Sequence, residues 1–396
     1  MTRSAITGSG RLLSMSGDRS RGLDAIEGPW SVLIEDGLVS EVREGPLRPG
    51  DPDQVTDVGL ALCTPGLVDP HTHLCFAGDR SDEAAARSRG EPYSGGGILR
   101  TVAASSAASD DELVRLTRRR LRRALASGTT TIEVKSGYGL GAEQELRMLR
   151  CIRLAADRLP MRVVRTYLGA HAVPAGSSPA GQAQAVIGAL PLVAPEADQI
   201  DVFCEPTMFD LGLTRMILDA GRAYGLGLRL HADQLQRSGA ALLGADMGVL
   251  SVDHLEQLTA EDADALAATD TVATMVPGPA LLLRGGVPPV AALLASGVIL
   301  AIGSDANAGT FGEPSMTLAI GLAVMLGFPV GDALWAATTG AARSLGLAGT
   351  TGRLAIGMAA DIVAWDAAHE GAFAMRPGAV SPVAMWIAGL PVTGDA

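Results

Sequence analysis

The stretch Thr64-Pro65-Gly66-Leu67-Val68-Asp69-Pro70-His71-Thr72-His73 decides the interpretation of this chain, because a short apolar run leads directly into two histidines. Near-continuous apolar runs of this length are typical of parallel strands that are buried on both faces. His71 and His73 are two residues apart, so both imidazoles project to the same side of an extended backbone. The stretch therefore predicts a buried strand that presents two histidines at its carboxyl end.

Similar apolar runs recur along the chain and predict eight strands. They are Gly66–Pro70, Thr129–Val134, Arg162–Leu168, Gln199–Cys204, Gly227–Leu230, Val249–Val252, Thr271–Val276 and Val298–Ile302. Segments between them, such as 111–127, 141–158 and 259–268, have acidic starts and apolar residues three and four apart, which predicts helices. Eight such units over ~290 residues match a (β/α)8 TIM-like barrel in count and length.

The two ends of the chain differ from this pattern and carry short strand-like pieces. These pieces are Trp30–Glu35, Leu38–Arg43, Ile362–Trp365 and Ala384–Ile387, with a turn signal at Asp36-Gly37. Neither end is long enough to build a good core alone, so we expect one small β-sandwich-like domain assembled from both. The predicted division of this α/β fold is barrel 63–351, with the small domain from 1–62 and 352–396.

A doubly wound sheet would also alternate strands and helices. Its phosphate loop requires a strand followed by a Gly-x-Gly-x-x-Gly pattern. The only candidate, Gly8-Ser9-Gly10, lacks the third glycine and has no predicted strand before it. The barrel is therefore the preferred fold.

Composition limits the classes of partner. The 396 residues are 47% hydrophobic and 19% charged with a net charge of −12, which is enough apolar material for a sizeable core. The basic cluster at 118–123 is interspersed with leucines, which predicts the solvent-exposed face of an amphipathic helix and not a surface that binds nucleic acid. We find no signal peptide and no apolar span of membrane length, so a membrane is not an expected partner either.

The four cysteines are scattered without a CxxC pair, which is typical of a reduced, cytoplasmic protein. Cys75 lies close to the histidine pair and offers a thiolate ligand in principle, although a buried neutral thiol is the ordinary state. All but one of the 31 basic residues are arginine. The single lysine, Lys135, suggests a position that arginine cannot serve, with chance as the alternative.

Residues just past the carboxyl ends of the predicted strands would line the active site of such a barrel. These residues are His71, His73, Lys135, His171, Glu205, His231, His254, Pro277 and Asp305. Only one of the six histidines, His369, lies elsewhere. Any one of these histidines alone is as readily a hydrogen-bonded core residue, but random scatter would rarely place five of them together.

A catalytic metal explains this distribution. His71, His73 and His231 supply neutral imidazole nitrogens, and Asp305 supplies a carboxylate. Three or four such ligands with one position open to water are how a catalytic divalent metal is held. A metal of this kind lowers the pKa of its water from ~15.7 towards ~7.

Longer motifs resemble a known family. Thr64 to His73 resembles the first-strand signature of the amidohydrolase superfamily, and residues 60–366 resemble its imidazolonepropionases. The matching motifs are Phe76-Ala77-Gly78-Asp79-Arg80, Gly95-Gly96-Gly97-Ile98, Glu133-Val134-Lys135-Ser136-Gly137-Tyr138-Gly139-Leu140, Leu168-Gly169-Ala170-His171, Asp201-Val202-Phe203-Cys204-Glu205, His231-Ala232-Asp233-Gln234, Asp253-His254-Leu255-Glu256 and Ala359-Ala360-Asp361. The Lys-Ser-Gly-Tyr-Gly and Phe-Cys-Glu strings are much more specific than the histidine pair.

The resemblance implies a reaction and the residues that perform it. The reaction is metal-dependent hydrolysis of the cyclic amide of 4-imidazolone-5-propanoate to N-formimidoyl-L-glutamate, in histidine degradation. The implied metal ligands, for one zinc or iron ion, are His71, His73, His231 and Asp305. The implied substrate and product contacts are Arg80, Tyr138, His171, Gln234, Asn307, Gly309 and Thr310. His254 and Asp305 would be catalytic, and the implied assembly is a homodimer.

The chemistry of these residues agrees with this reaction. The Arg80 fork suits the carboxylate of an anionic substrate. Asp305 can move a proton from water to the leaving nitrogen, and His254 can bind the developing oxyanion or orient the water. The alternative interpretations are that Arg80 forms a salt bridge at the surface and that Tyr138 is an ordinary aromatic residue of a turn.

Two positions depart from family patterns. Ala308 replaces the usual proline after Asn307, which frees one backbone dihedral and predicts a modest effect on the product loop. Some superfamily members bridge two metals with a lysine that ends the fourth strand, but here Glu205 ends that strand and Lys135 ends the second. We therefore expect one metal, with Lys135 either in an ion pair or behind the metal ligands, and with Glu205 as a candidate partner.

Two other functions stay open at this point. Another mononuclear amidohydrolase, such as a deaminase of a nucleobase-like ring or a cyclic amidase, would share the metal and the barrel but would not need Arg80 for an anionic arm. A catalytically silent metal-binding protein would need neither the proton shuttle nor the substrate contacts.

Overall fold

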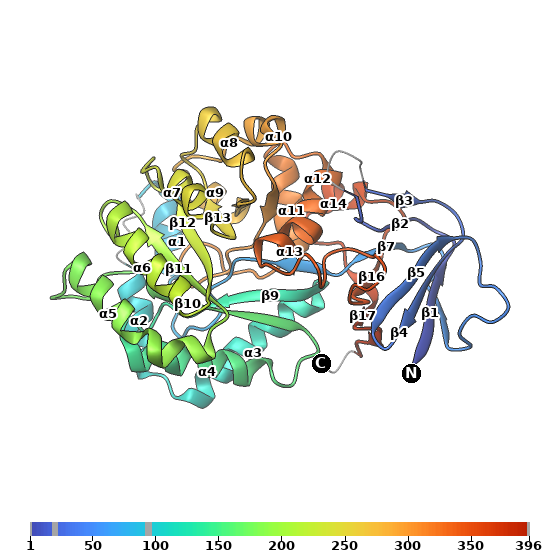
Figure 1. The fold of residues 1–396 in the computed structure, drawn as a ribbon, viewed down its shortest axis with the longest axis horizontal. Coiled ribbons are helices and arrows are strands. Elements are labelled where there is room, and N and C mark those ends of the chain that lie inside the picture. The colour runs from blue at the N-terminus through green and yellow to red at the C-terminus, as the bar shows by residue number, and fades with distance from the viewer. Residues whose placement is uncertain (1, 18–22, 92–96, 394–396) are drawn as a thin grey trace.

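Eight parallel strands form the centre of the fold (Figure 1). The computed structural model describes residues 2–17, 23–91 and 97–393. The strands pair in the order β15-β14-β13-β12-β11-β10-β9-β8. Their bounds are β8 (Leu67–Asp69), β9 (Thr129–Lys135), β10 (Arg162–Ala170), β11 (Gln199–Cys204), β12 (Gly227–Ala232), β13 (Ser251–His254), β14 (Val272–Met275) and β15 (Leu300–Ile302). Every predicted strand overlaps one of these, which confirms the eight-stranded pattern.

The two edges of this sheet meet just beyond the last strand residues. A parallel bridge joins Thr72 to Ala306, and the His73 amide donates to the Ala306 carbonyl at 2.9 Å. The sheet is thereby nearly closed into a barrel. Because Thr72 lies between His71 and His73, the closure fixes the backbone that carries both histidines.

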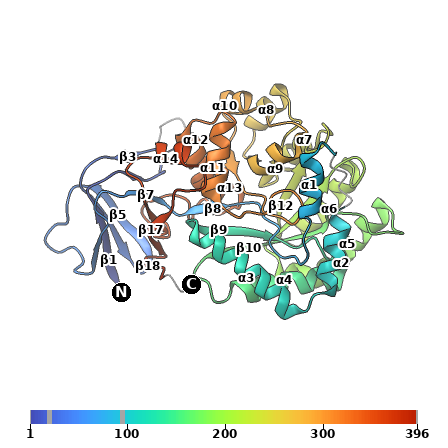
Figure 2. The same ribbon diagram turned by 180° about the vertical axis from the view of Figure 1, so that it is seen from behind.

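Helices cover the outside of the barrel (Figures 1 and 2). Along the chain they are α1 (Ser81–Ser88), α2 (Ile98–Ala107), α3 (Asp110–Ala126), α4 (Ala142–Ala156), α5 (Pro179–Val193), α6 (Leu211–Ala223), α7 (Ala240–Met247), α8 (Ala260–Ala267), α9 (Pro277–Leu283), α10 (Val290–Ser296), α11 (Met316–Met325), α12 (Val330–Trp335) and α13 (Ala341–Ser344), with α14 (Gly371–Met375) near the C-terminus. The helices predicted at 111–127, 141–158 and 259–268 are confirmed as α3, α4 and α8. Within the described ranges, no helix has the length and apolarity needed to cross a membrane.

Helix α3 shows how the sequence produces this layer. The Ser109 hydroxyl accepts from the Glu112 amide and caps the helix, and three acidic residues occupy the first turn, where the helix dipole favours negative charge. Leu113 and Leu121 are buried against the barrel. The basic residues at 118–123 are exposed or half-buried, and Arg120 donates to the carbonyls of Leu74 and Phe76 at 2.7 and 2.8 Å. The prediction of an amphipathic helix is confirmed.

Two additional sheets lie beside the barrel. One has the order β5-β4-β1-β6 and the other β18-β17-β16-β7-β2-β3, so the second combines both ends of the chain. The strands are β1 (Arg3–Gly8), β2 (Leu12–Leu13), β3 (Ala25–Ile26), β4 (Trp30–Glu35), β5 (Leu38–Glu44), β6 (Val55–Asp57), β7 (Leu62–Pro65), β16 (Ile362–Trp365), β17 (Pro382–Ile387) and β18 (Leu390–Pro391). The predicted strand pieces at both ends are confirmed. The exact domain bounds at 63 and 351 stay a prediction.

A separate hydrophobic cluster joins these two sheets. Trp30 and Val32 come from the first sheet, and Cys63, Ile362 and Trp386 come from the second. The small β-domain predicted from both chain ends is therefore present, although its first sheet uses the N-terminal end alone.

One expectation about the N-terminus is wrong. Strand β1 does precede Gly8-Ser9-Gly10, where no strand was expected. Its neighbour β4 is antiparallel to it, and β1 lies outside the barrel sheet. The glycine pair therefore belongs to the terminal sheet, and the choice of the barrel stands.

Candidate active site

A cavity opens at the carboxyl ends of the barrel strands. It is lined by His73, Arg80, Ile98, Tyr138, His171, Phe203, His231, Gln234, His254, Asp305, Asn307 and Thr310. Most of the residues predicted from the strand ends therefore meet in one place. Gly309 and Ala308 line a neighbouring hollow instead. Gly95 and Gly96 of the predicted glycine motif lie outside the described residues.

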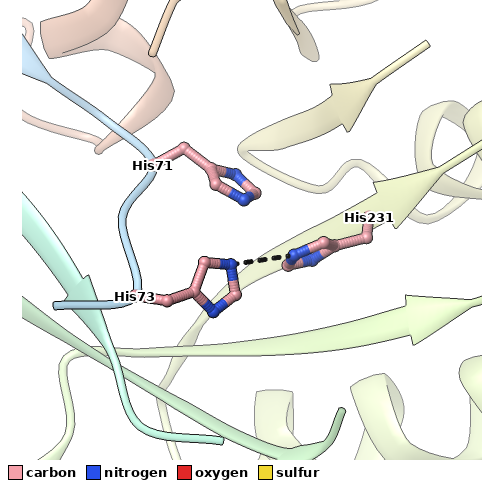
Figure 3. Close-up of side chains that lie close together, drawn as sticks. All are labelled: His71, His73 and His231. Carbon is pink, nitrogen blue, oxygen red and sulfur yellow. Dashed lines mark hydrogen bonds between the residues drawn. The ribbon is translucent and has the colours of Figure 1, made fainter. Parts of the chain in front are cut away.

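Three histidines converge beside this cavity (Figure 3), and two of them, His73 and His231, line it. His71 and His73 lie on the segment that leaves β8, and His231 lies on β12. Nε2 of His231 is 3.4 Å from Nε2 of His73, and the ring centroids of His71 and His231 are 4.6 Å apart. One nitrogen from each ring lies within 4.8 Å of the other two. The spacing is that of a set of metal ligands that surround one point.

Asp305 and His254 complete the group. Oδ1 of Asp305 is 3.4 Å from Nε2 of His73 and 3.7 Å from Nε2 of His71. Asp305, His71 and His254 form a second set whose ligand atoms lie within 4.8 Å of one another. His254 and Asp305 adopt left-handed backbone conformations, with φ of 84° and 47°. Non-glycine residues rarely adopt such conformations, which cluster at functional sites.

The residues present fit a metal ion. Nε2 of His71 and Oδ1 of Asp305 are buried and have no hydrogen-bond partner among the described residues. An unsatisfied buried polar atom is costly, and a cation between these atoms would satisfy both. Three imidazoles and a carboxylate are a donor set that suits zinc and iron alike. Cys75 is not part of either group, and burial raises the pKa of its thiol to about 12.

The protonation states also favour metal binding. Burial, reinforced by Lys135 and by competition with the neighbouring histidines for a proton, holds the pKa of both His71 and His73 well below the ordinary range. Burial likewise lowers the pKa of His231. These rings are therefore neutral at pH 7, which is the form that ligates a metal.

His254 and Asp305 have pKa values displaced in the opposite direction. Burial disfavours the charged form of His254, but the Glu256 carboxylate and Asp305 outweigh it and raise the pKa to about 9. Burial raises the pKa of Asp305 to about 7, although His254 opposes the shift. The cavity thus contains a histidine that carries a proton at neutral pH beside a carboxyl group that titrates near neutrality.

Two buried carboxylates orient the histidines from behind. Nδ1 of His71 is 2.6 Å from Oδ2 of Asp253, and Nδ1 of His231 is 3.0 Å from Oδ1 of Asp201. A carboxylate bound to Nδ1 favours a proton on that atom and leaves Nε2 to face the metal. Both carboxylates were missed as site residues at the sequence level. Acidic residues within apolar strand runs were the signal that could have revealed them.

Lys135 forms the expected ion pair behind the histidines, but Glu205 is not its partner. Lys135 is buried, and its Nζ lies 2.8 Å from Oε1 of Glu133 and 2.8 Å from Oδ2 of Asp201. Glu205 instead accepts the Leu235 amide at 2.7 Å, within the loop after β12. Lys135 and Glu133 are two residues apart on β9 and point to the same face, whereas Glu205 lies beyond the end of β11.

Arg80 lies at one wall of the cavity and is 4% exposed. Its Nε and Nη2 donate to the two carboxylate oxygens of Glu83 at 3.0 and 2.8 Å. The guanidinium packs against two glycines, because a Cβ at Gly97 or Gly309 would lie 2.2 or 2.4 Å from its Nη2 or Nη1. Arg80 is therefore a fixed cation at the cavity and not a surface residue.

Aromatic rings form another wall. The His171 ring stacks on His73 at 5.1 Å between centroids, and its Nδ1 is 2.9 Å from the Gly137 carbonyl. Burial lowers the pKa of His171 to about 3. Tyr138 is buried beside it, with the two ring centroids 5.3 Å apart. Phe203, which sequence reasoning did not select, completes this wall.

The loop after β15 is folded around Asn307. Its side-chain oxygen accepts from the amides of Gly309 and Thr310 at 2.8 Å each, and its nitrogen donates to the Asp305 carbonyl at 2.7 Å. The Asn307 side chain therefore shapes the loop that carries Asp305. Ala308 lies within this turn and makes none of these side-chain contacts.

Comparison with known proteins gives relatives over most of the chain. Residues 93–392 match the amidohydrolase family. An imidazolonepropionase of Salinispora arenicola (strain CNS-205) is 47% identical over 356 residues, which are 88% of each chain. One of Nocardia farcinica (strain IFM 10152) is 39% identical over 382 residues, which cover 96% of this chain and 95% of its own.

Solved structures of lower identity share the fold. An adenosine deaminase from Xanthomonas campestris with bound zinc superposes with a TM-score of 0.74 at 18% identity, covering 98% of this chain and 92% of its own. An atrazine chlorohydrolase from Arthrobacter aurescens TC1 complexed with zinc gives a TM-score of 0.73 at 17% identity, covering 98% and 95%. At these identities the likeness concerns the barrel and the terminal sheets.

Proposed function

The chain belongs to the imidazolonepropionases, hydrolases of the amidohydrolase family, and we propose that it opens the cyclic amide of 4-imidazolone-5-propanoate to N-formimidoyl-L-glutamate at the cavity described above. One observation carries the assignment of the site. The donor atoms of His71, His73, His231 and Asp305 lie close together beside a cavity whose wall contains the buried cation Arg80.

We infer that these four residues hold one metal ion, zinc or iron. When bound, such an ion polarises the ring carbonyl and lowers the pKa of water. The chain's own residues then have to orient the ring, transfer the proton and hold the anionic arm.

Asp305 is suited to the proton transfer. Its carboxylate lines the cavity, where it can accept a proton from the attacking water and release it within the same cycle. In the reaction, a bond forms between the water oxygen and the carbonyl carbon, and the bond from that carbon to the ring nitrogen breaks. The leaving nitrogen takes the proton that Asp305 received.

His254 is suited to the charge that develops on the carbonyl oxygen. Burial lowers its pKa, but the Glu256 carboxylate raises it, and the protonated ring can donate a hydrogen bond to that oxygen. Glu256, whose Oε1 lies 3.4 Å from His254 Nδ1, orients the ring. No conformational change is needed to bring His254 to the cavity, since it already lines the wall.

The substrate's propanoate arm would bind at Arg80, because a guanidinium recognises a carboxylate in a fixed geometry. Tyr138, His171 and Gln234 would contact the remainder of the ring and arm. Asn307, Gly309 and Thr310 would act on the product side, with Asn307 acting through the shape of its loop. We further propose a cytoplasmic homodimer. The four buried free cysteines support the reduced compartment.

Incubation of purified, metal-loaded protein with enzymatically prepared imidazolonepropionate tests this proposal. Mass spectrometry should detect N-formimidoyl-L-glutamate, which is heavier than the substrate by one water. If the protein leaves this substrate intact but releases ammonia from a neutral nucleobase-like ring, it is a deaminase. If it turns over neither compound, the silent metal-binding alternative replaces the proposal.

A further inference from the structure

The only lysine of the chain occupies an unusual place, behind the three histidines of the site. Lys135 lies at the end of β9 and is fully buried. Its Nζ is equidistant, at 2.8 Å, from one oxygen of Glu133 and one oxygen of Asp201, and both carboxylates are also fully buried. A charge in such a place is costly unless its partners compensate it, so the arrangement requires all three groups together.

Each carboxylate of this group reaches a different part of the histidine cluster. Asp201 uses its other oxygen for His231, accepting from the ring at 3.0 Å and from the backbone amide at 3.2 Å. Glu133 uses its other oxygen for the Thr72 amide at 3.0 Å, and the Thr72 hydroxyl donates to the Glu133 carbonyl at 2.6 Å. Thr72 is the residue between His71 and His73.

We propose that Lys135 is a positioning residue of the metal centre: by clamping Glu133 to Asp201, it fixes the His231 ring relative to the backbone that carries His71 and His73. The inference rests on the proposed metal site but assigns a function to residues beyond its ligands. Lys135 is not one of the residues that line the cavity, and the partners of its Nζ are the two carboxylates, through which it acts on the site.

A comparison with Arg229, the second buried cation behind the histidines, explains why an arginine would not fit at position 135. Arg229 spreads its planar fork over several partners, the Asp253 carboxylate and the Pro70 carbonyl at 2.8 Å and the Ser344 carbonyl at 2.7 Å. Lys135 instead has two carboxylate oxygens around one nitrogen. A compact ammonium fits such a site, whereas a guanidinium would force the two carboxylates apart.

The test measures metal affinity, not turnover. Lys135→Met keeps much of the volume of the side chain and removes the charge. Outer-shell partners of a metal typically contribute 10- to 100-fold to its affinity, so the dissociation constant for Co²⁺ from chelator competition should rise by roughly this factor. The visible absorption spectrum of the bound Co²⁺ should change as well, because the ligand geometry relaxes. Lys135→Arg should show the same loss, although the charge is retained.

Arg11→Met is the matched control. Arg11 also forms an ion pair with a buried carboxylate, Glu370 at 2.8 Å, but it lies beside the terminal sheet. This variant should lose stability without any change in metal affinity or spectrum. A wild-type dissociation constant and spectrum in Lys135→Met would overturn the inference.

Two further measurements keep the test decisive. If Lys135→Met fails to fold by circular dichroism, Asp201→Asn addresses the same clamp with an isosteric change, and it should also weaken Co²⁺ binding about 10-fold or more. Wild-type affinity in that variant would overturn the inference. If wild-type protein itself binds no metal, or if His71→Ala binds as well as wild type, the metal site of the proposed function has failed instead.

Discussion

Replacing Arg80 by methionine removes the cation that we expect to bind the substrate's carboxylate. The side chain is 4% exposed and is held in place by Glu83. Arg100 also contacts Glu83, with its Nη1 3.2 Å from Oε1. Glu83 therefore keeps a positive neighbour in Arg80→Met, and methionine fills much of the space of the arginine stem. The change is directed at the charge and not at the fold.

The size of the effect follows from the strength of the contact. A charge-assisted hydrogen-bonded pair between guanidinium and carboxylate contributes ~1.5–3 kcal/mol. This energy corresponds to roughly 10- to 150-fold in binding, so KM for imidazolonepropionate should rise by about that factor. The arm is bound in the ground state and the transition state alike, so kcat should change far less.

Steady-state kinetics with the natural substrate and with an analogue that lacks the carboxylate check this prediction. The analogue should be processed almost equally by wild type and Arg80→Met. Arg80→Lys should recover little, because a point charge does not reproduce the fork. Arg100→Met is the control, since it also loses a contact to Glu83 but lies outside the cavity, and its KM should stay unchanged. An unchanged KM in Arg80→Met, or an equal loss for both compounds, would refute the assignment of Arg80.

Three other changes give independent outcomes. His71→Ala should lose bound metal and activity together while circular dichroism reports an intact fold; activity at the wild-type level would exclude His71 as a ligand. Asp305→Asn should lower kcat by at least on the order of 10²-fold with a smaller change in KM, and a metal-loaded variant with normal kcat would remove Asp305 from proton transfer. Gly309→Ala places a Cβ 2.4 Å from the Arg80 guanidinium and should raise KM. Gly312→Ala, whose Cβ would meet nothing within 4 Å, should not raise it, and equal KM values in these two variants would contradict the role of the close packing.

Much of the fold could be predicted because parallel barrel strands are buried on both faces. Apolar runs such as Gln199–Cys204 therefore stand out in the sequence, and β11 has these bounds in the structure. The convergence of His71, His231 and Asp305 could also be predicted, since all carboxyl ends of parallel strands meet at one rim. Their roles in the reaction are inferred from family resemblance and stay a prediction.

The contacts of the buried charged residues behind the histidines could not be predicted to the same extent. These residues are Lys135, Glu133, Asp201 and Asp253. Lys135 stood out only because it is the single lysine, and the sequence does not show which carboxylate it contacts. The choice depends on the curvature of the barrel, which brings β9 close enough to β11 for Lys135 to reach Asp201. Asp253 was missed for the same reason, since its contact with His71 spans 182 positions in the sequence.

Titration of metal into metal-free protein, with product formation followed at each step, tests the central claim most directly. We predict that formation of N-formimidoyl-L-glutamate from imidazolonepropionate rises linearly with added zinc or iron and reaches its plateau at one ion per chain. Full activity in the absence of metal, or a plateau only at two ions per chain, would contradict a single metal held by His71, His73, His231 and Asp305.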